Sequence, residues 1–322
     1  MKSLAFDTLV NVAIASGATS PVPTDGVGAQ AWSTTLGAPV WWDGTKWDSS
    51  KGVQVDIYTS SGTYTKPGWA GEVEVILIGG GGGGWSGKKG AAASGRQGGT
   101  VGTGGALTRQ IFPSSAITSS VTVTVGAGGT GGAAQTTNST AGNAGTGGGA
   151  TSFGTYAYAQ GGKTGATATA SGNAAGGTFP SLAGGAINSL GSLPPNGNIP
   201  ASVAASCGGQ GGGIPSSNTP NPGTQGAQLP TVASGSNAES TISFTAIGTS
   251  ASAPTDNTIA QWFGGIGGDG GGAANGANGG NGANGGKWGG GGGGGGAAVD
   301  SVGNSGKGGD GGGGLAVVIS RA

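Results

Sequence analysis

The chain has 322 residues, of which 82 are glycine and only 7% are charged, a composition far from that of an ordinary globular enzyme. Twelve Lys and Arg residues balance twelve Asp and Glu residues, so the net charge gives no reason to expect binding to nucleic acid or to an anionic membrane surface. Histidine is absent, which excludes His-dependent catalytic triads and most zinc sites, and no apolar run reaches the roughly 18 residues of a membrane span.

Disorder is one interpretation of this composition, because glycine enrichment of this order is common in low-complexity chains. The low charge, the eight Trp residues and several short β-favouring runs favour the opposite interpretation. Disordered chains usually combine high net charge with few aromatic residues. We therefore expect folded β-structure with small, local hydrophobic cores.

Residues 1–52 are predicted to form an N-terminal attachment module. Its segment 4–14 is mildly apolar and is compatible with a short helix or a strand. Asp43-Gly44 separates two β-favouring runs, 40–42 and 45–47, a pattern typical of a β-hairpin. Such a ribbon carries more tryptophan than it can bury alone, so we expect either a partner chain or a small core to cover it. The candidate anchoring or oligomerisation residues are Trp32, Trp41, Trp42 and Trp47.

Residues 53–322 are predicted to form a second, glycine-rich β-domain. Its clearest strand is Glu72–Ile78, in which Val73, Val75 and Leu77 share one face, and a run of glycines at 79–84 follows directly. The predicted strands cover residues 53–57, 72–78, 106–112, 120–125, 151–159, 241–247 and 315–319. Short strands joined by turn-rich connections predict a mainly β fold, an antiparallel β-sandwich or jelly-roll-like domain.

Long glycine-rich insertions, at approximately 79–105, 126–150, 160–240 and 264–314, interrupt this domain. Structureless connections of such length are uncommon in compact domains, so these insertions need an order of their own. In the last insertion Asn275, Asn278, Asn281 and Asn284 recur at every third residue, and each precedes a glycine. A period of three is that of an extended polyproline-II-type helix, whose backbone groups must pair sideways. Nearly proline-free segments of this kind favour a polyglycine-II lattice over collagen.

Three motifs that suggest chemistry are incomplete. Residues 82–88 match the start of a P-loop, but Lys89 stands where Ser or Thr would hold Mg²⁺. Residues 264–272 resemble one calcium-binding nonapeptide repeat, which does not recur. The carboxylates are scattered among turns and strand ends, so a glycan-hydrolysing pair remains only the remote enzyme alternative. We predict no catalytic residues, no metal and no cofactor.

Bulky side chains among the glycine helices supply the specific chemistry of the insertions. Aromatic faces bind sugar rings and apolar loops, and neighbouring cations bind phosphates or carboxylates. An equally weighted interpretation is that the tryptophans fill gaps where the lattice meets the sheet. The candidate binding residues of the glycine-rich domain are Trp85, Lys88, Lys89, Arg96, Trp262, Phe263, Lys287 and Trp288.

Two sets of segments resemble known phage proteins. The string TTLGAPVWWDGTKWDS at residues 34–49 resembles the short WWDG-type module of bacteriophage tail and fibre proteins. The order of SSGTYTKPGWAGEVEVILIGGGGGG, GGTGGALTRQIFPSSAITSSVTVTVGAGGTGG, GGGATSFGTYAYAQGG and GGDGGGGLAVVISRA is similar to the glycine-rich domain of phage tail fibres and receptor-binding proteins. The likeness runs from about residue 31 to the C-terminus, but residues 179–261 have no counterpart in it.

This resemblance implies a non-enzymatic structural protein of a phage tail, made in the host cytoplasm and carried in the virion. It implies recognition of the bacterial surface, a glycan or an outer-membrane protein, through the glycine-rich loops. It also implies a homotrimer that contacts other tail or baseplate proteins through its N-terminal region, with no nucleic acid and no membrane span. The alternative is a virion decoration or connector protein whose glycine-rich region only packs.

Overall fold

The computed structural model describes residues 53–165, 207–226, 248–251 and 265–321, together with short stretches of the N-terminal region at 11–12, 19, 30–33, 38–42, 44–45 and 47–49. The predicted strand at 241–247 and the candidate residues Trp262 and Phe263 lie outside the described residues. Within the described ranges, no helix has the length and apolar character that crossing a membrane requires.

The N-terminal strands form a small sheet of their own, in the order β1 (Asn11–Val12), β2 (Gln30–Ser33), β3 (Ala38–Trp42) and β4 (Trp47–Ser49). The predicted hairpin is confirmed, because β3 and β4 are antiparallel with Trp42 opposite Trp47, and Gly44 between them has a φ of 105°. Both Trp side chains are buried, and their rings meet edge to face with centroids 5.7 Å apart. Trp32 lies in β2 and Trp41 in β3.

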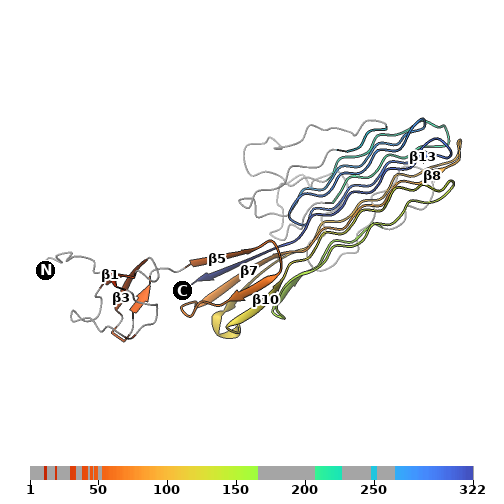
Figure 1. Ribbon diagram of the computed structural model, residues 1–322. Coiled ribbons are helices and arrows are strands. Elements are labelled where there is room, and N and C mark those ends of the chain that lie inside the picture. Colours follow the sequence, from red (N-terminus) through yellow and green to blue (C-terminus); the bar gives the residue numbers. More distant parts are fainter. Residues whose placement is uncertain are drawn as a thin grey trace, which may run out of the picture.

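Two antiparallel four-stranded sheets form the start of the glycine-rich domain (Figure 1), which confirms the predicted mainly β, antiparallel fold class. The first sheet has the order β5 (Val53–Tyr58), β14 (Leu315–Arg321), β7 (Glu72–Ile78) and β9 (Leu107–Pro113). The second has the order β12 (Ala157–Ala159), β11 (Thr151–Phe153), β10 (Ser120–Thr124) and β6 (Gly62–Thr65). A single 3-10 turn, η1 (Ser114–Ala116), follows β9.

The core lies between these sheets because alternate residues of each strand are apolar. Val73, Val75 and Leu77 of β7 are fully buried, as their alternation predicts, and they pack with Val123 of β10 and Phe153 of β11. Burying a side chain of this kind contributes roughly 1.5–3 kcal/mol relative to leaving it exposed. The prediction of one strand over 151–159 was wrong: Gly154, with a φ of 51°, turns the chain so that β11 and β12 pair with each other.

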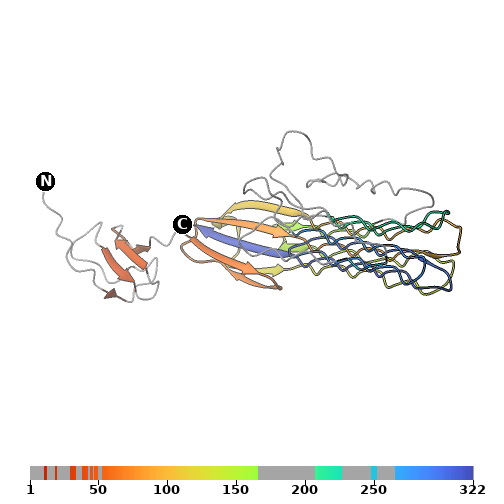
Figure 2. The ribbon, with the colours of Figure 1, turned by 90° about the horizontal axis from the view of Figure 1, so that it is seen from above.

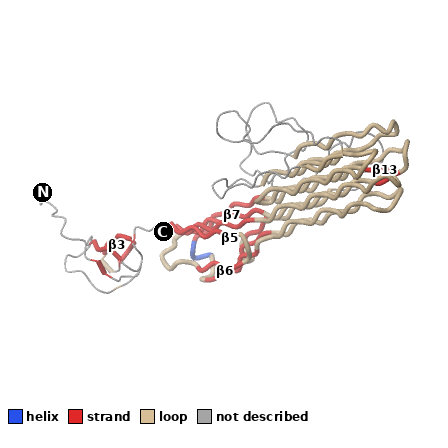
Figure 3. The backbone as a smooth tube through the Cα atoms, turned by 45° about the horizontal axis from the view of Figure 1, so that its top comes forward, coloured by secondary structure: helices blue, strands red, loops and turns tan. Residues whose placement is uncertain are grey.

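Beyond the sandwich the chain runs as long extended segments that lie side by side (Figures 2 and 3). In segment 79–89 the backbone amides donate to three neighbouring segments in rotation, with a period of three residues. The first neighbour is segment 97–106, whose carbonyls at Ala106, Thr103, Thr100 and Gln97 accept from Gly79, Gly82, Trp85 and Lys88, respectively. The second is segment 140–149, whose carbonyls at Gly149, Thr146, Asn143 and Thr140 accept from Gly80, Gly83, Ser86 and Lys89. The third is segment 306–312, whose carbonyls at Gly312, Gly309 and Gly306 accept from Gly81, Gly84 and Gly87. The described parts of the insertions therefore form a polyglycine-II-type lattice, as the period of three predicts.

The lattice ends in a set of turns far from the sandwich. There, two short parallel strands, β8 (Lys89–Gly90) and β13 (Ala298–Val299), pair with each other (Figure 1). We call the five turns at this end, residues 90–96, 135–140, 214–221, 274–278 and 298–304, the tip turns. The other end of each segment leads back toward the sandwich, so the lattice separates the tip turns from the sheets.

Candidate functional site

Glycine is needed in the lattice because it lacks a Cβ. Among the described residues, positive φ values at glycine are confined to Gly44, Gly154, Gly248 and Gly289, so most lattice glycines have backbone angles that other residues also adopt. A Cβ added at Gly81, however, would overlap the backbone carbonyl oxygen of Gly290. A larger residue is therefore tolerated only where a segment faces solvent or a gap, and each bulky residue in the lattice marks such a position.

Short polar side chains bond to lattice amides that have no backbone carbonyl facing them. The Oδ1 atoms of Asn278, Asn281 and Asn284 accept hydrogen bonds of 2.7, 2.8 and 2.9 Å, respectively. The donors are the backbone amides of Asn304, Lys307 and Asp310. The spacing of these asparagines thus has a structural role at the lattice edge. Asn275 differs, because it lies in a tip turn and its Nδ2 donates to the carbonyl oxygen of Asn218 at 3.0 Å.

The tip turns contain all four non-glycine residues with positive φ found among the described residues: Ala93, Ser139, Asn218 and Ser301, with φ between 53° and 64°. Such conformations cost energy and persist only where surrounding contacts hold them. Here Asn218 accepts the amide of Ala93 at 2.9 Å, and Asp300 accepts both the amide and the hydroxyl of Ser139, at 2.8 and 2.6 Å. These contacts support the positive-φ conformations of Ala93 and Ser139 and join the tip turns to one another.

Two of the predicted receptor-binding cations hold the tip turns together. Arg96 is only 2% exposed, and its guanidinium donates to the carbonyl of Ala91 and to Oδ1 of Asn218, both at 2.6 Å. Burial lowers the pKa of Arg96. Lys89 is 6% exposed, and its Nζ donates to the carbonyl of Thr136 at 2.9 Å and to Asn304 at 3.3 Å. Both charges lie inside the tip rather than on its surface.

Trp288 and Lys287 lie at the opposite end of the lattice from Arg96. Trp288 is 8% exposed and packs with Ile78, Leu315 and Val317 on the outer face of the first sheet. This is the environment expected of a tryptophan that fills a gap where the lattice meets the sheet. Lys287 is exposed beside it. The structure therefore places Lys287 and Trp288 apart from the candidate residues near the tip, which are Trp85, Lys88, Lys89 and Arg96.

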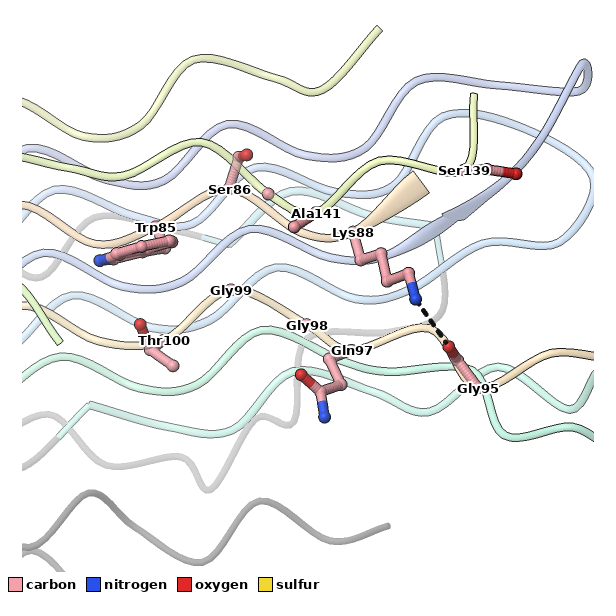
Figure 4. A pocket seen from close by; sticks show the side chains of 11 residues that line it. Trp85, Ser86, Lys88, Gly95, Gln97, Gly98, Gly99, Thr100, Ser139 and Ala141 are labelled. Atoms are coloured by element: carbon pink, nitrogen blue, oxygen red, sulfur yellow. Dashed lines mark hydrogen bonds between the residues drawn. The ribbon is translucent and has the colours of Figure 1, made fainter. Parts of the chain in front are cut away.

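Trp85 and Lys88 line a groove of about 190 Å³ near the tip (Figure 4). The lining residues that the structure describes come from three segments and are Trp85, Ser86, Lys88, Gly95, Gln97, Gly98, Gly99, Thr100, Ser139, Ala141 and Gly142. Both Trp85 and Lys88 are half-buried, and the Lys88 Nζ is 3.5 Å from the carbonyl oxygen of Gly95. In the part of the chain that the structure describes, no group of three or more Cys, Asp or Glu side chains is arranged to hold a metal ion.

Sequence reasoning missed Gln97, Thr100, Ser139 and Asn218 as neighbours of the predicted residues. The sequence does contain a signal that Trp85 and Lys88 share one side of their segment. They follow Gly79 and Gly82 at a spacing of three residues, and both glycines face a neighbouring segment. Large residues in that phase indicate that the neighbour no longer fills the space. No comparable pattern marks Ser139 or Asn218, which lie in turns.

Comparison with known families accounts for most of the chain. The profile of a family described as Glycine-rich domain matches residues 58–321, a range that begins at the end of β5 and includes β14. A search of the curated proteins found no match. Because the matched range covers well over half of the chain, the chain belongs to the glycine-rich domain family.

Proposed function

We propose that this chain is a receptor-binding protein of a phage tail, a structural virion protein that recognises the bacterial surface through its tip turns. The observation that carries the proposal is the contrast between the lattice and its end. Side chains are excluded where lattice segments pack together, whereas the tip turns combine exposed residues with backbone conformations held by Asn218 and Asp300. A rigid stalk that presents fixed turns suits recognition of another surface.

In this proposal the protein has no enzymatic activity, is made in the host cytoplasm and assembles into the tail as a homotrimer. The N-terminal module, with Trp32, Trp41, Trp42 and Trp47, attaches it to other tail or baseplate proteins. The receptor is a glycan or an outer-membrane protein. Support for this part comes from the likeness of residues 34–49 and of the glycine-rich segments to phage tail proteins.

A virion decoration or connector protein is the second candidate. The observation that favours it is the burial of Lys89, Arg96 and Trp288, which are used in packing. Exchange of tip turns between two related phages with different hosts separates the candidates. We expect adsorption to follow the exchanged turns 91–95 and 215–220. Unchanged adsorption by virions that contain normal amounts of the exchanged protein would favour the decoration or connector role.

A further inference from the structure

The groove at Trp85 continues one row of the lattice. The described part of this row is segment 160–165, which lies between three other segments. Gly162 donates to Gly80 at 2.7 Å and accepts from Gly148 at 2.8 Å, and Gly165 donates to Val101 at 2.9 Å. The groove is lined by the same three segments farther along, at 85–88, 95–100 and 139–142.

Three sets of residues, each with a spacing of three, face this row. A Cβ at Gly79 or Gly82 would meet segment 160–165, so Trp85 and Lys88, in the same phase, face the continuation of the row. Gln97 and Thr100, three residues apart, form the second set. Thr100 faces segment 160–165, because a Cβ at Gly165 would lie 2.7 Å from its Oγ1 atom. Ala141 is in the phase of Gly147, which also faces segment 160–165.

The side chains that meet in the groove combine an aromatic ring, a cation and neutral polar groups. Because the extended helix rises about 3.1 Å per residue, Trp85 and Lys88 are about 9 Å apart along the groove. Among the described lining residues none is acidic, and the carboxylate of nearby Asp300 is engaged by Ser139. The Nε1 atom of Trp85 and the Oγ1 atom of Thr100 are buried and have no hydrogen-bond partner among the described residues, so the indole face, Lys88 and Gln97 are the groups left for a ligand.

We infer that this groove binds an acidic polysaccharide. The indole of Trp85 lies against the face of a sugar ring, Lys88 pairs with a carboxylate or phosphate farther along the same chain, and the side-chain amide of Gln97 binds hydroxyl groups. The inference rests on the proposed function and deepens it, because it identifies the class of surface molecule that one part of the protein recognises. A neutral polysaccharide would satisfy Trp85 but not Lys88.

Titration calorimetry of the full-length protein tests this assignment with three probes: polygalacturonate, which carries carboxylates, phosphomannan, which carries phosphates, and neutral mannan. We expect saturable binding of at least one acidic probe, weakened by salt. Lys88→Gln should lower its affinity by about tenfold or more, as expected for loss of a charge-assisted hydrogen bond. Trp85→Ala should lower it as well, whereas the control Lys307→Gln, at an exposed lysine outside the groove, should leave it unchanged.

The assignment is overturned if neither acidic probe binds, or if Lys88→Gln and Lys307→Gln have the same effect. Circular dichroism of each variant identifies any loss of folding, and the Lys88 comparison stands even if Trp85→Ala is unstable. Failure here is distinguishable from failure of the proposed function. If exchanged tip turns redirect adsorption while the groove variants bind the probes like wild type, only the groove assignment fails. If the probes bind through Trp85 and Lys88 but exchanged turns leave adsorption unchanged, recognition by the tip turns fails.

Discussion

The side-chain oxygen of Asn281 accepts the backbone amide of Lys307 at 2.8 Å, in the place that a carbonyl of another lattice segment would take. Asn278 and Asn284 repeat this contact one turn before and one turn after. The next amide along, that of Gly282, donates to the carbonyl oxygen of Lys307 at 2.9 Å. The side chain of Asn281 and the amide of Gly282 thus bond to the amide and the carbonyl oxygen of Lys307, respectively, in the neighbouring segment.

Replacing Asn281 with Ala should destabilise this edge. The amide of Lys307 would lose its acceptor, and we expect a loss of about 0.5–1.5 kcal/mol in the free energy of unfolding. Asn281→Asp is the matched control, because its carboxylate still accepts the bond. Chemical denaturation and amide exchange at Lys307 measure the effect. Equal exchange rates at Lys307 in wild type and Asn281→Ala would show that the contact contributes nothing.

Two glycine-to-alanine substitutions should have opposite consequences. In Gly81→Ala the new Cβ overlaps the carbonyl oxygen of Gly290, so we expect destabilisation of about 2 kcal/mol or more. Gly313 lies in the same lattice, but a Cβ there meets no atom within 4 Å. Gly313→Ala should be neutral or stabilising by up to about 1 kcal/mol, because it restricts the unfolded chain. Similar denaturation midpoints for the two variants would be inconsistent with the lattice.

Asp269 should make the domain more stable at acidic than at neutral pH. Burial raises the pKa of its carboxyl above the ordinary value, against a smaller lowering by the amide of Gly226, which it accepts at 2.7 Å. Since the folded-state pKa is raised, the cost of ionisation is absent below the unfolded-state pKa and grows as pH rises through the folded-state pKa. Asp269→Asn keeps the hydrogen bond without the charge, so it should raise Tm at pH 7 and have little effect near pH 3. A lower Tm at pH 7 would contradict this reasoning.

Glu74 should have the opposite dependence on pH. Its carboxylate is buried and paired with Arg109 and Arg321 on the outer side of the first sheet. Burial alone would raise the pKa of Glu74, but the hydrogen bonds and charges of the two arginines outweigh it and lower the pKa. Its contribution to stability is therefore complete above the unfolded-state pKa and is lost as pH falls through the lowered folded-state pKa.

Glu74→Gln should consequently cost about 1–3 kcal/mol at pH 7, where the wild-type pairs are formed. The difference between the two proteins should shrink as both are acidified. Thermal unfolding of both proteins between about pH 2 and pH 7 measures this stability difference, because carboxylates titrate within that range. A difference that stays constant down to the lowest pH would mean that the ion pairs do not stabilise the sheet.

Sequence patterns predicted the strands better than the arrangement of the lattice. The alternation in Glu72–Ile78 identified the buried face of β7, and the asparagine spacing identified the period of three. Lattice neighbours are joined by backbone hydrogen bonds, which leave no side-chain signal, so the sequence did not reveal which segments lie together. The burial of Arg96 illustrates this, since one of its partners, Asn218, is 122 residues away in the chain.

The measurement that tests the lattice most directly is amide hydrogen exchange of the full-length protein at neutral pH. Segments 79–89 and 289–298 have few side chains to pack, so their protection depends on hydrogen bonds to neighbouring segments. We predict slow exchange throughout both, comparable to that of β7 and β14. Exchange of segments 79–89 and 289–298 at the rate of an unfolded chain, with β7 and β14 still protected, would contradict the lattice and remove the rigid support of the tip turns.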